Sequence, residues 1–248
     1  MSEHNYIVIE AISEVASYRI PEYHNYHKTL PLPPPTTIIG MVGAALGYSA
    51  AQAQSLFDET NPEIGIYGCF DGIFKDLWKY SSTKKGTESS ILQREYLYNN
   101  VYCFVIGADY EITFMIKEAL NNCKYPITAG NSDSLMKLVN CQILDDSNII
   151  KTNEVEHCMI IGDYRKNLSI SLDNLEPNKV YVFKAVFAPV TYNLPMAFNY
   201  DNYGIRQIRS RKDITFVHTR CELNDTELLK ALNYREKKIP LFNYNESI

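Results

Sequence analysis

A chain of 248 residues with 46% hydrophobic and 12% aromatic residues can bury a sizeable core, in one large domain or in two modest ones. This composition excludes a disordered chain. The formal net charge of −5 argues against a protein whose whole surface binds nucleic acid, because phosphates attract clustered Lys and Arg. Any nucleic-acid function therefore needs a local basic patch.

The cysteines and the first residues bear on compartment and on metal binding. The six cysteines form no CxxC pair, and Glu3, Glu10 and Glu14 stand where a secretory signal needs an apolar run. We therefore expect reduced thiols and a cytoplasmic protein. His157 and Cys158 are adjacent, but no second pair follows at ligand spacing. The sequence predicts no metal and no other cofactor.

The first elements in chain order are a strand and a helix with an unusual beginning. "NYIVIEAI", residues 5–12, is rich in β-branched residues and predicts a strand. Pro33 to Pro35 then favour an extended approach to a small helix, which Thr36 or Thr37 can cap.

The small residues of this helix indicate that another backbone comes close to it. They are Gly40, Gly43, Ala44 and Gly47. A packed sheet is the favoured neighbour, and a phosphate backbone at the N-terminal amides is the alternative. A membrane-spanning reading of residues 36–57 is rejected because the stretch is too polar and has no flanking basic cluster.

The middle of the chain completes a recognisable order. "EIGIYGCF", residues 63–70, predicts a strand, and 71–93 predicts a projecting hairpin, with a mobile loop as the alternative. Residues 94–109 read as extended, 112–120 as an amphipathic helix and 134–144 as a strand. The order is the split βαβ arrangement of a ferredoxin-like domain, the fold that also underlies the RNA-recognition motif.

From residue 146 the pattern becomes β-rich. "NLSISL" alternates, and "VYVFKAVFAPV", residues 180–190, predicts a buried strand. Asn224 and Glu227 have capping-box spacing and predict a terminal helix through about Lys237. We therefore expect an α+β protein, with a ferredoxin-like domain over 1–145 and a smaller β-rich domain over 146–248.

Four spaced motifs of this sequence resemble a known family. "TLPLPPPTTIIGMVGAALG", residues 29–47, closely resembles the signature of the Cas-five family in the CRISPR-associated RAMP superfamily. "SYRIP", "REYL" and "YPITAGNSDSL" look like further features of that family, and the resemblance covers about the first 140 residues. The C-terminal third matches only in character.

The resemblance implies a non-catalytic, RNA-binding subunit of a type I CRISPR interference complex (Cascade) in antiviral defence. Such a subunit holds the 5′ handle of the crRNA and caps the backbone filament. The 71–93 hairpin would be a thumb beside the neighbouring backbone subunit, and a large subunit that recognises target DNA would lie on the outer side. Chain length and the lack of a convincing nuclease triad favour a type I-B-like system with a separate processing enzyme.

The candidate RNA-binding residues supply guanidinium, ammonium, hydroxyl, aromatic or exposed backbone groups. They are Arg19, Lys28, Thr36, Thr37, Gly40, Arg94, Tyr96, Gly130, Ser132, Arg206, Arg209 and Lys212. The candidate partner contacts on the thumb are Trp78, Lys79, Tyr80, Lys84 and Lys85. An ordinary solvated face or loop is the alternative for the basic residues of 75–85 and 206–212, and a plain turn is the alternative for Gly130 and Ser132.

Two other functions stay open. One branch of the family resembles a metal-independent endoribonuclease, and its proton-transfer groups would here come from Tyr23, His24, Tyr26, His27 and Lys28. The other alternative is a protein-interaction module without RNA contact, in which some of the 19 tyrosines anchor an interface.

Overall fold

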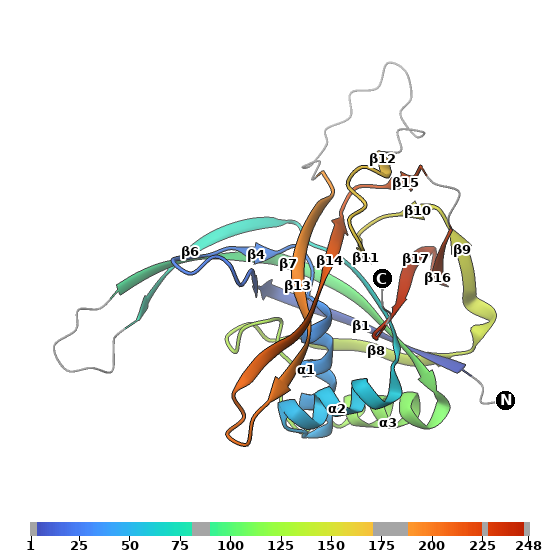
Figure 1. The fold of residues 1–248 in the computed structure, drawn as a ribbon, viewed down its shortest axis with the longest axis horizontal. Helices are drawn as coiled ribbons and strands as arrows, with labels where there is room; N and C mark the ends of the chain where they lie inside the picture. The colour runs from blue at the N-terminus through green and yellow to red at the C-terminus, as the bar shows by residue number, and fades with distance from the viewer. Residues whose placement is uncertain (1–3, 81–89, 171–187, 225–227, 246–248) are drawn as a thin grey trace, which may run out of the picture.

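The structure is a computed structural model that describes residues 4–80, 90–170, 188–224 and 228–245. Over these residues the chain is an α+β protein, mostly strands, with three α-helices grouped on one side of a curled antiparallel sheet (Figure 1). The helices are α1 (Pro35–Leu46), α2 (Ala50–Thr60) and α3 (Tyr110–Asn121). In the described part of the chain, no helix has the length and apolar character needed to cross a membrane.

The strands follow one another along nearly the whole chain. They are β1 (His4–Ala16), β2 (Tyr18–Arg19), β3 (Tyr26–His27), β4 (Thr29–Leu30), β5 (Glu63–Cys69), β6 (Gly72–Tyr80), β7 (Ser90–Asp109), β8 (Lys137–Leu144), β9 (Ile149–Thr152), β10 (Glu154–Val155), β11 (Cys158–Ile161), β12 (Leu168–Ile170), β13 (Val190–Tyr200), β14 (Arg206–Val217), β15 (Cys221–Leu223), β16 (Leu229–Tyr234) and β17 (Lys237–Asn243).

Four of these strands form the centre of the main sheet. β1 pairs with β8 on one edge and with β7 on the other, and β7 pairs with β5, all antiparallel. One helical stretch connects β1 to β5 and α3 connects β7 to β8, so the predicted order of strand, helix, strand, insertion, strand, helix, strand is confirmed.

The two faces of this sheet bury different partners. On one face, Ile7 and Ile9 of β1 pack in a core that includes Ile38 of α1, Phe57 of α2 and Ile116 of α3. On the opposite face, side chains of β1 and β7 pack against the hairpin of β16 and β17. A strand buried on both faces needs nearly continuous apolar sequence, which "NYIVIEAI" supplies.

The β-rich part after residue 146 continues the same sheet. Leu241 to Asn243 of β17 pair with Gly65 to Glu63 of β5, and Cys158 of β11 pairs with Tyr67. Hydrogen-bonded strands join the parts of the chain before and after residue 146. The division into two domains between residues 145 and 146 stays a prediction. Most of the expected strand over 180–190 lies outside the described residues.

The single small helix expected after the prolines is two helices. α1 ends at Leu46 and is followed by the C-cap residue Gly47, whose φ of 77° is left-handed, and Ser49 is the N-cap residue of α2, with a capping box to Gln52. The expected cap at Thr36 or Thr37 was wrong, because Pro34 is the N-cap residue and no side chain caps α1. Pro35 is pre-organised for the first helical position.

The close neighbour of α1 at Gly43 is another helix and not the sheet. A Cβ atom added at Gly43 would lie 2.7 Å from Cβ of Ala53 in α2. A side chain at position 43 would therefore push the two helices apart.

The terminal helix expected over 224–237 was also wrong, and β16 and the start of β17 lie there instead. Arg235 and Glu236 have φ values of 46° and 67°, the pair of positive values that a tight type I′ hairpin turn requires. Strand pairing overrides the local capping pattern here, because β16 pairs with both β17 and β9. Glu227 lies outside the described residues.

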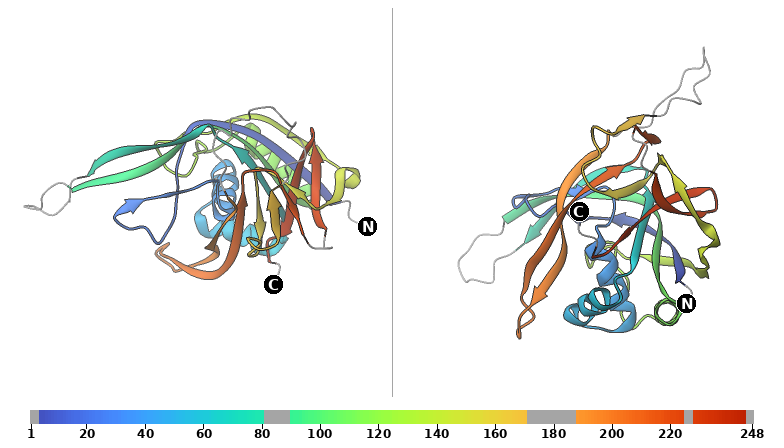
Figure 2. Two further views of the ribbon diagram at one scale, coloured as in Figure 1. Left: turned by 90° about the horizontal axis from the view of Figure 1, so that it is seen from above. Right: turned by 45° about the vertical axis from the view of Figure 1, so that its right-hand side comes forward.

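Two hairpins project from the body of the protein (Figures 1 and 2). The first pairs β6 with the outer half of β7, from Gly72 opposite Tyr98 to Tyr80 opposite Ser90, where a projecting hairpin was predicted. The second, which we call the arm, pairs β13 with β14 from Val190 opposite Phe216 to Tyr200 opposite Arg206.

Candidate nucleic-acid interface

A cavity of 230 Å³ opens beside the start of α1, and we call it the α1 pocket. Four separate parts of the chain form it: the β2 region, the start of α1, the turn around residue 130, and the arm. Its lining residues are Ser17, Tyr18, Arg19, Pro21, Leu30, Pro34, Thr36, Thr37, Gly130, Asn131, Leu194, Pro195, Phe198 and Arg206.

The N-terminus of α1 lies at the wall of this pocket. No side chain caps the helix and its first turn contains no acidic residue, so nothing in the helix itself offsets the positive end of its dipole. The amide of Thr37 donates to the carbonyl of Pro34 at 2.8 Å, and Pro35 has no amide hydrogen to present. Thr36 and Thr37 add two hydroxyl groups at the pocket wall.

Two arginines face the same cavity from opposite ends of the chain. Arg19 lies on β2 and Arg206 begins β14, and both are exposed. The guanidinium of Arg206 lies over the ring of Phe198 at 5.0 Å, an arrangement that keeps it extended while leaving its donors accessible. In the described part of the chain, neither arginine is engaged in an ion pair.

The pocket unites five residues that were predicted from four distant stretches of sequence. They are Arg19, Thr36, Thr37, Gly130 and Arg206. Two cations, two hydroxyl groups and a helix start around one small cavity suit an anion attached to a planar group, such as a nucleotide. The remaining predicted residues lie elsewhere.

Arg94 and Tyr96 are buried and contact their own protein. Each is 7% exposed, and the Arg94 guanidinium donates to the Tyr96 hydroxyl at 2.7 Å and pairs with Asp133 at 3.1 Å. The guanidinium also lies over the ring of Trp78 at 4.5 Å, and Tyr96 stacks on Phe74. These two side chains therefore stiffen the β6–β7 hairpin, and any effect on RNA would be indirect.

Three further predicted residues are near the surface but do not line the pocket. Gly40 is exposed, with open space where a Cβ would be, and Ser132 is exposed in the turn that follows Gly130. Lys28 is half-buried, with its ammonium over the Tyr23 ring at 5.6 Å. Gly130 itself has a φ of 94°, and a Cβ there would lie 2.1 Å from the carbonyl oxygen of Ser17, so glycine is required by packing.

Arg209 and Lys212 lie farther along the arm. Arg209 donates from both terminal nitrogens to the carboxylate of Asp58 on α2, so it fastens the arm to the body. Burial acts to raise the pKa of Asp58, but the hydrogen bonds and charge of Arg209 hold that pKa below its ordinary value. Lys212 lines two other cavities.

The candidate nuclease residues form a loop against the β6–β7 hairpin. Tyr26 and His27 of β3 pair in parallel with Gln93 and Arg94 of β7. The Tyr26 hydroxyl donates to the Glu95 carboxylate, and burial together with this bond raises the pKa of Tyr26.

His27 differs from its neighbours in its electrostatic environment. Burial, followed by the positive charges of Arg19 and Arg94, lowers the pKa of its imidazole, which favours the neutral ring. A neutral imidazole can act as a base, while the Tyr26 hydroxyl is hydrogen-bonded to Glu95 and the Lys28 ammonium lies over the Tyr23 ring.

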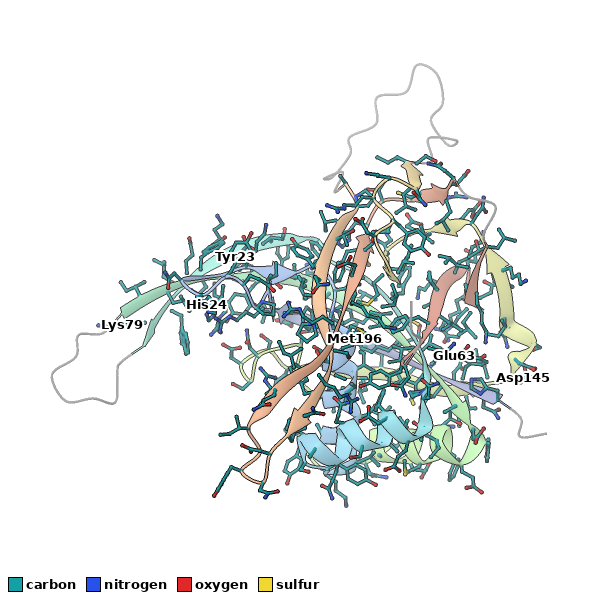
Figure 3. All side chains as sticks on the ribbon, in the orientation of Figure 1. Tyr23, His24, Glu63, Lys79, Asp145 and Met196 are labelled. Atoms are coloured by element: carbon teal, nitrogen blue, oxygen red, sulfur yellow. The ribbon has the colours of Figure 1, made fainter. Side chains whose placement is uncertain are left out.

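The β6–β7 hairpin carries an exposed apolar surface toward its end. Leu77, Trp78 and Ile91 are exposed, and Lys79 lies near the outer end of β6 (Figure 3). Exposed apolar groups on a projecting hairpin are typical of protein contact. Lys84 and Lys85 lie outside the described residues, and the Tyr80 side chain is not among those described.

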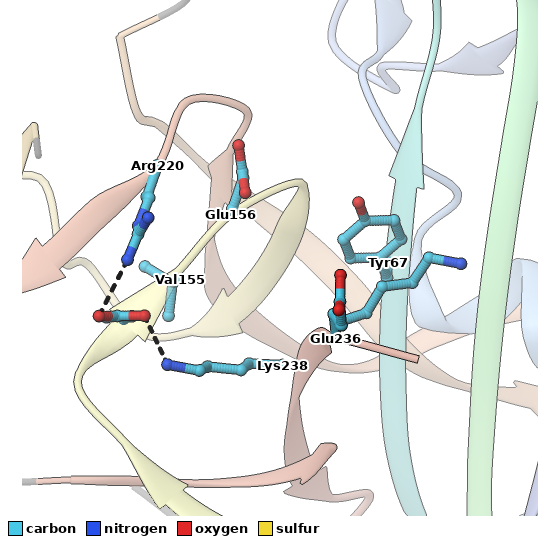
Figure 4. A pocket seen from close by; sticks show the side chains of 8 residues that line it. Tyr67, Val155, Glu156, Arg220, Glu236 and Lys238 are labelled. Atoms are coloured by element: carbon cyan, nitrogen blue, oxygen red, sulfur yellow. Dashed lines mark hydrogen bonds and ion pairs between the residues drawn. The ribbon is translucent and has the colours of Figure 1, made fainter. Parts of the chain in front are cut away.

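One other cavity is less suited to nucleic acid. A 190 Å³ cavity beside β10 and β17 holds Glu154 between Arg220 and Lys238 (Figure 4). Its three acidic and three basic side chains balance, so it attracts neither sign of charge strongly. Among the residues that the structure describes, no three His, Cys, Asp or Glu side chains gather as they would around a metal ion.

Phe198 is the aromatic pocket residue under Arg206, and sequence reasoning missed it. The signal was present in "FNYDNYGIR", where Asp201 to Gly204 can turn a hairpin and bring Phe198 opposite the residues after Arg206. Only the register of that hairpin tells which aromatic ring lies under the guanidinium.

The fold and the pocket together define an α+β protein with a curled antiparallel sheet, a projecting hairpin, and a cationic pocket beside a second hairpin. The family model described as CRISPR-associated protein (Cas_Cas5) matches residues 6–156. Because this match covers more than half of the chain, the protein belongs to the CRISPR-associated Cas5 family. No curated protein matches the sequence.

Solved structures resemble the fold at low sequence identity. A chain of a CRISPR RNA-guided surveillance complex is 15% identical, with a TM-score of 0.51 over 87% of this chain and 90% of that one. A CRISPR protein from Archaeoglobus fulgidus is 10% identical, with a TM-score of 0.48 over 96% and 99%. A third structure, of a Cas protein, is 15% identical with a TM-score of 0.36, and the match spans 52% of this chain and 57% of that one.

Proposed function

We propose that this protein is a non-catalytic crRNA-binding subunit of a type I CRISPR interference complex, of the I-B-like kind, acting in antiviral defence. It holds the 5′ handle of the crRNA and caps one end of the backbone filament. Its partners are the crRNA, the backbone subunit and a large subunit, and its contact with target DNA is indirect. Family membership and the surveillance-complex fold match support this assignment.

The observation that carries the proposal is the α1 pocket. A protein with a net charge of −5 has little reason to leave two exposed arginines beside an uncapped helix start, unless an anion occupies that place. The ring of Phe198 adds a surface on which a base can stack. Handle RNA supplies both the phosphates and the unstacked bases.

The topology supports an RNA-binding role within the family. The strand order β8–β1–β7–β5, with helices connecting β1 to β5 and β7 to β8, is the order of a ferredoxin-like domain. We propose that the direct contacts come from Arg19, Thr36, Thr37 and Arg206, while Arg94 and Tyr96 act by stiffening the thumb.

The β6–β7 hairpin is the proposed thumb and contacts the neighbouring backbone subunit. Its outer strands expose Leu77, Trp78 and Ile91 next to Lys79, which combines an apolar anchor with a positive charge beside RNA. We expect the Trp78 side chain to be held in place, because the Arg94 guanidinium lies over its ring.

The experiment is a retention and cleavage assay on one gel, in EDTA, with labelled crRNA that carries the handle. The purified protein, alone and co-purified with its complex, is compared with Arg19→Ala and Arg206→Ala. Arg165→Ala is the control, because Arg165 is exposed and pairs with Asp163, outside the pocket. We expect each pocket variant to weaken retention about tenfold and to reduce the salt dependence, with Arg165→Ala unchanged.

Two outcomes contradict the proposal. If all three variants retain the crRNA as well as the natural protein does, the pocket does not hold RNA. Specific cleavage in EDTA that disappears in His27→Ala assigns the protein to the endoribonuclease branch instead.

A further inference from the structure

The end of the arm exposes an unusual set of apolar side chains. Tyr203 is 91% exposed, Ile205 62% and Ile208 49%, and we call these three residues the arm tip. Both views in Figure 2 show the end of the arm projecting away from the helices beside it. Apolar groups concentrated at a projecting end are costly in water and are typical of a contact surface.

The turn that presents Tyr203 is pre-organised. The Asp201 carboxylate accepts hydrogen bonds from the amides of Tyr203 at 2.9 Å and Ile205 at 2.8 Å. The Asp201 backbone carbonyl accepts from the amide of Gly204 at 3.0 Å, and Gly204 supplies a φ of 76°. The turn is therefore closed before any partner binds, which reduces the entropy lost on binding.

The arm is also fastened to the body on both sides of its length. Arg209 is paired with Asp58 of α2, and Gln54 of α2 accepts the amide of Phe198 at 3.1 Å. Arg211 donates to Glu22 at 2.6 Å. A hairpin held in this way can place its tip at a fixed distance from the α1 pocket.

The charges of the tip favour a protein partner over nucleic acid. Residues 199–208, which include the three tip residues, contain one acidic side chain, Asp201, and one basic side chain, Arg206. The nearest cation, Arg206, lies over Phe198 at the pocket. A phosphate backbone needs cations at its contacts, whereas an apolar protein pocket is matched by Tyr and Ile.

The area of the tip also limits the partner. Three side chains bury on the order of a few hundred Å², well below the ~1,200 Å² of a stable interface, so the tip cannot hold a second copy of this chain by itself. It can act as an anchor for a protein that is already held in the same assembly by RNA and by the thumb.

We propose that the arm tip inserts into an apolar pocket of a different protein subunit in the same ribonucleoprotein complex, next to the RNA at the α1 pocket. This rests on the proposed function, because it needs a multi-subunit complex. Tyr203 is the anchor, and Ile205 and Ile208 surround it.

The test uses the complete complex, co-expressed with its crRNA. A photo-crosslinking phenylalanine derivative replaces Tyr203, or, as the control, Tyr110, which is also exposed but lies on α3. In parallel, Tyr203→Ser combined with Ile205→Ser is compared with Tyr110→Ser for subunit stoichiometry and crRNA content. Unchanged melting temperatures establish that the variants fold.

We expect irradiation to join position 203, and not position 110, to one protein subunit. That subunit should fall at least fivefold in complexes of the double variant while crRNA content stays the same. A crosslink from position 203 to RNA or DNA, no crosslink, or full subunit stoichiometry in the double variant overturns the inference. If the complex that contains the unsubstituted protein holds no crRNA, this result counts against the proposed function instead. The two failures are therefore distinguishable.

Discussion

We expect His218 to make the stability of this protein depend on pH. Its ring lies edge-on to Phe70, with centroids 5.0 Å apart, and 6.4 Å from the ring of His157. Burial, and then the positive charge that His157 can carry, lower the pKa of His218 from 6.5 to about 4. The folded protein therefore binds this proton less readily than the unfolded chain does.

The sign and the size of the effect follow from that difference. Above pH 6.5 both states are neutral at His218 and the group contributes nothing. Between pH 6.5 and pH 4 only the unfolded state takes up the proton, so the free energy of unfolding falls as the pH falls. The full loss is about 3 kcal/mol, of which about 2 kcal/mol is reached at pH 5.

The assay is urea unfolding of the natural protein and of His218→Phe at pH 7.5 and pH 5. The difference between the two proteins at pH 7.5 is the baseline, since the substitution also changes packing. We expect that difference to shift by about 2 kcal/mol in favour of the variant at pH 5. His24→Phe, in an exposed loop, is the matched control for replacing imidazole by phenyl. If the difference in free energy of unfolding between the two proteins is the same at pH 7.5 and pH 5, the reasoning is refuted.

Two substitutions test the geometry around the candidate interface. Gly130→Ala places a Cβ 2.1 Å from the Ser17 carbonyl oxygen at a positive φ, so we expect a loss of at least about 2 kcal/mol in urea unfolding, and a loss below about 0.5 kcal/mol would contradict the tight turn. Arg209→Ala removes the paired bonds to Asp58, and because both groups are partly exposed we expect only about 1 kcal/mol. Limited proteolysis should then cut the arm near Tyr203 faster, while an unchanged cleavage rate would show that the pair does not fasten the arm.

Much of the fold could be predicted because its signals are local. The β-branched run at residues 5–12, the amphipathic spacing over 112–120 and the hairpin after Asp71 all match the observed elements. The terminal segment after Asn224 could not be predicted in this way, because its spacing suits a helix and only pairing with β9 and β17 makes it a strand. Strand pairing depends on partners far away in the chain, and local propensity does not report them.

The candidate site divides along the same line. Residue type and motif alone selected Arg19, Thr36 and Arg206 as groups that suit an anion, and the proline run determined where α1 begins. Only the tertiary structure brought these groups to one cavity, paired Arg209 with Asp58, and buried Arg94 under Trp78. The physical reason is that a guanidinium has the same chemistry at every position of a sequence, whereas its role depends on which carboxylate, ring or helix end the folded chain places within reach.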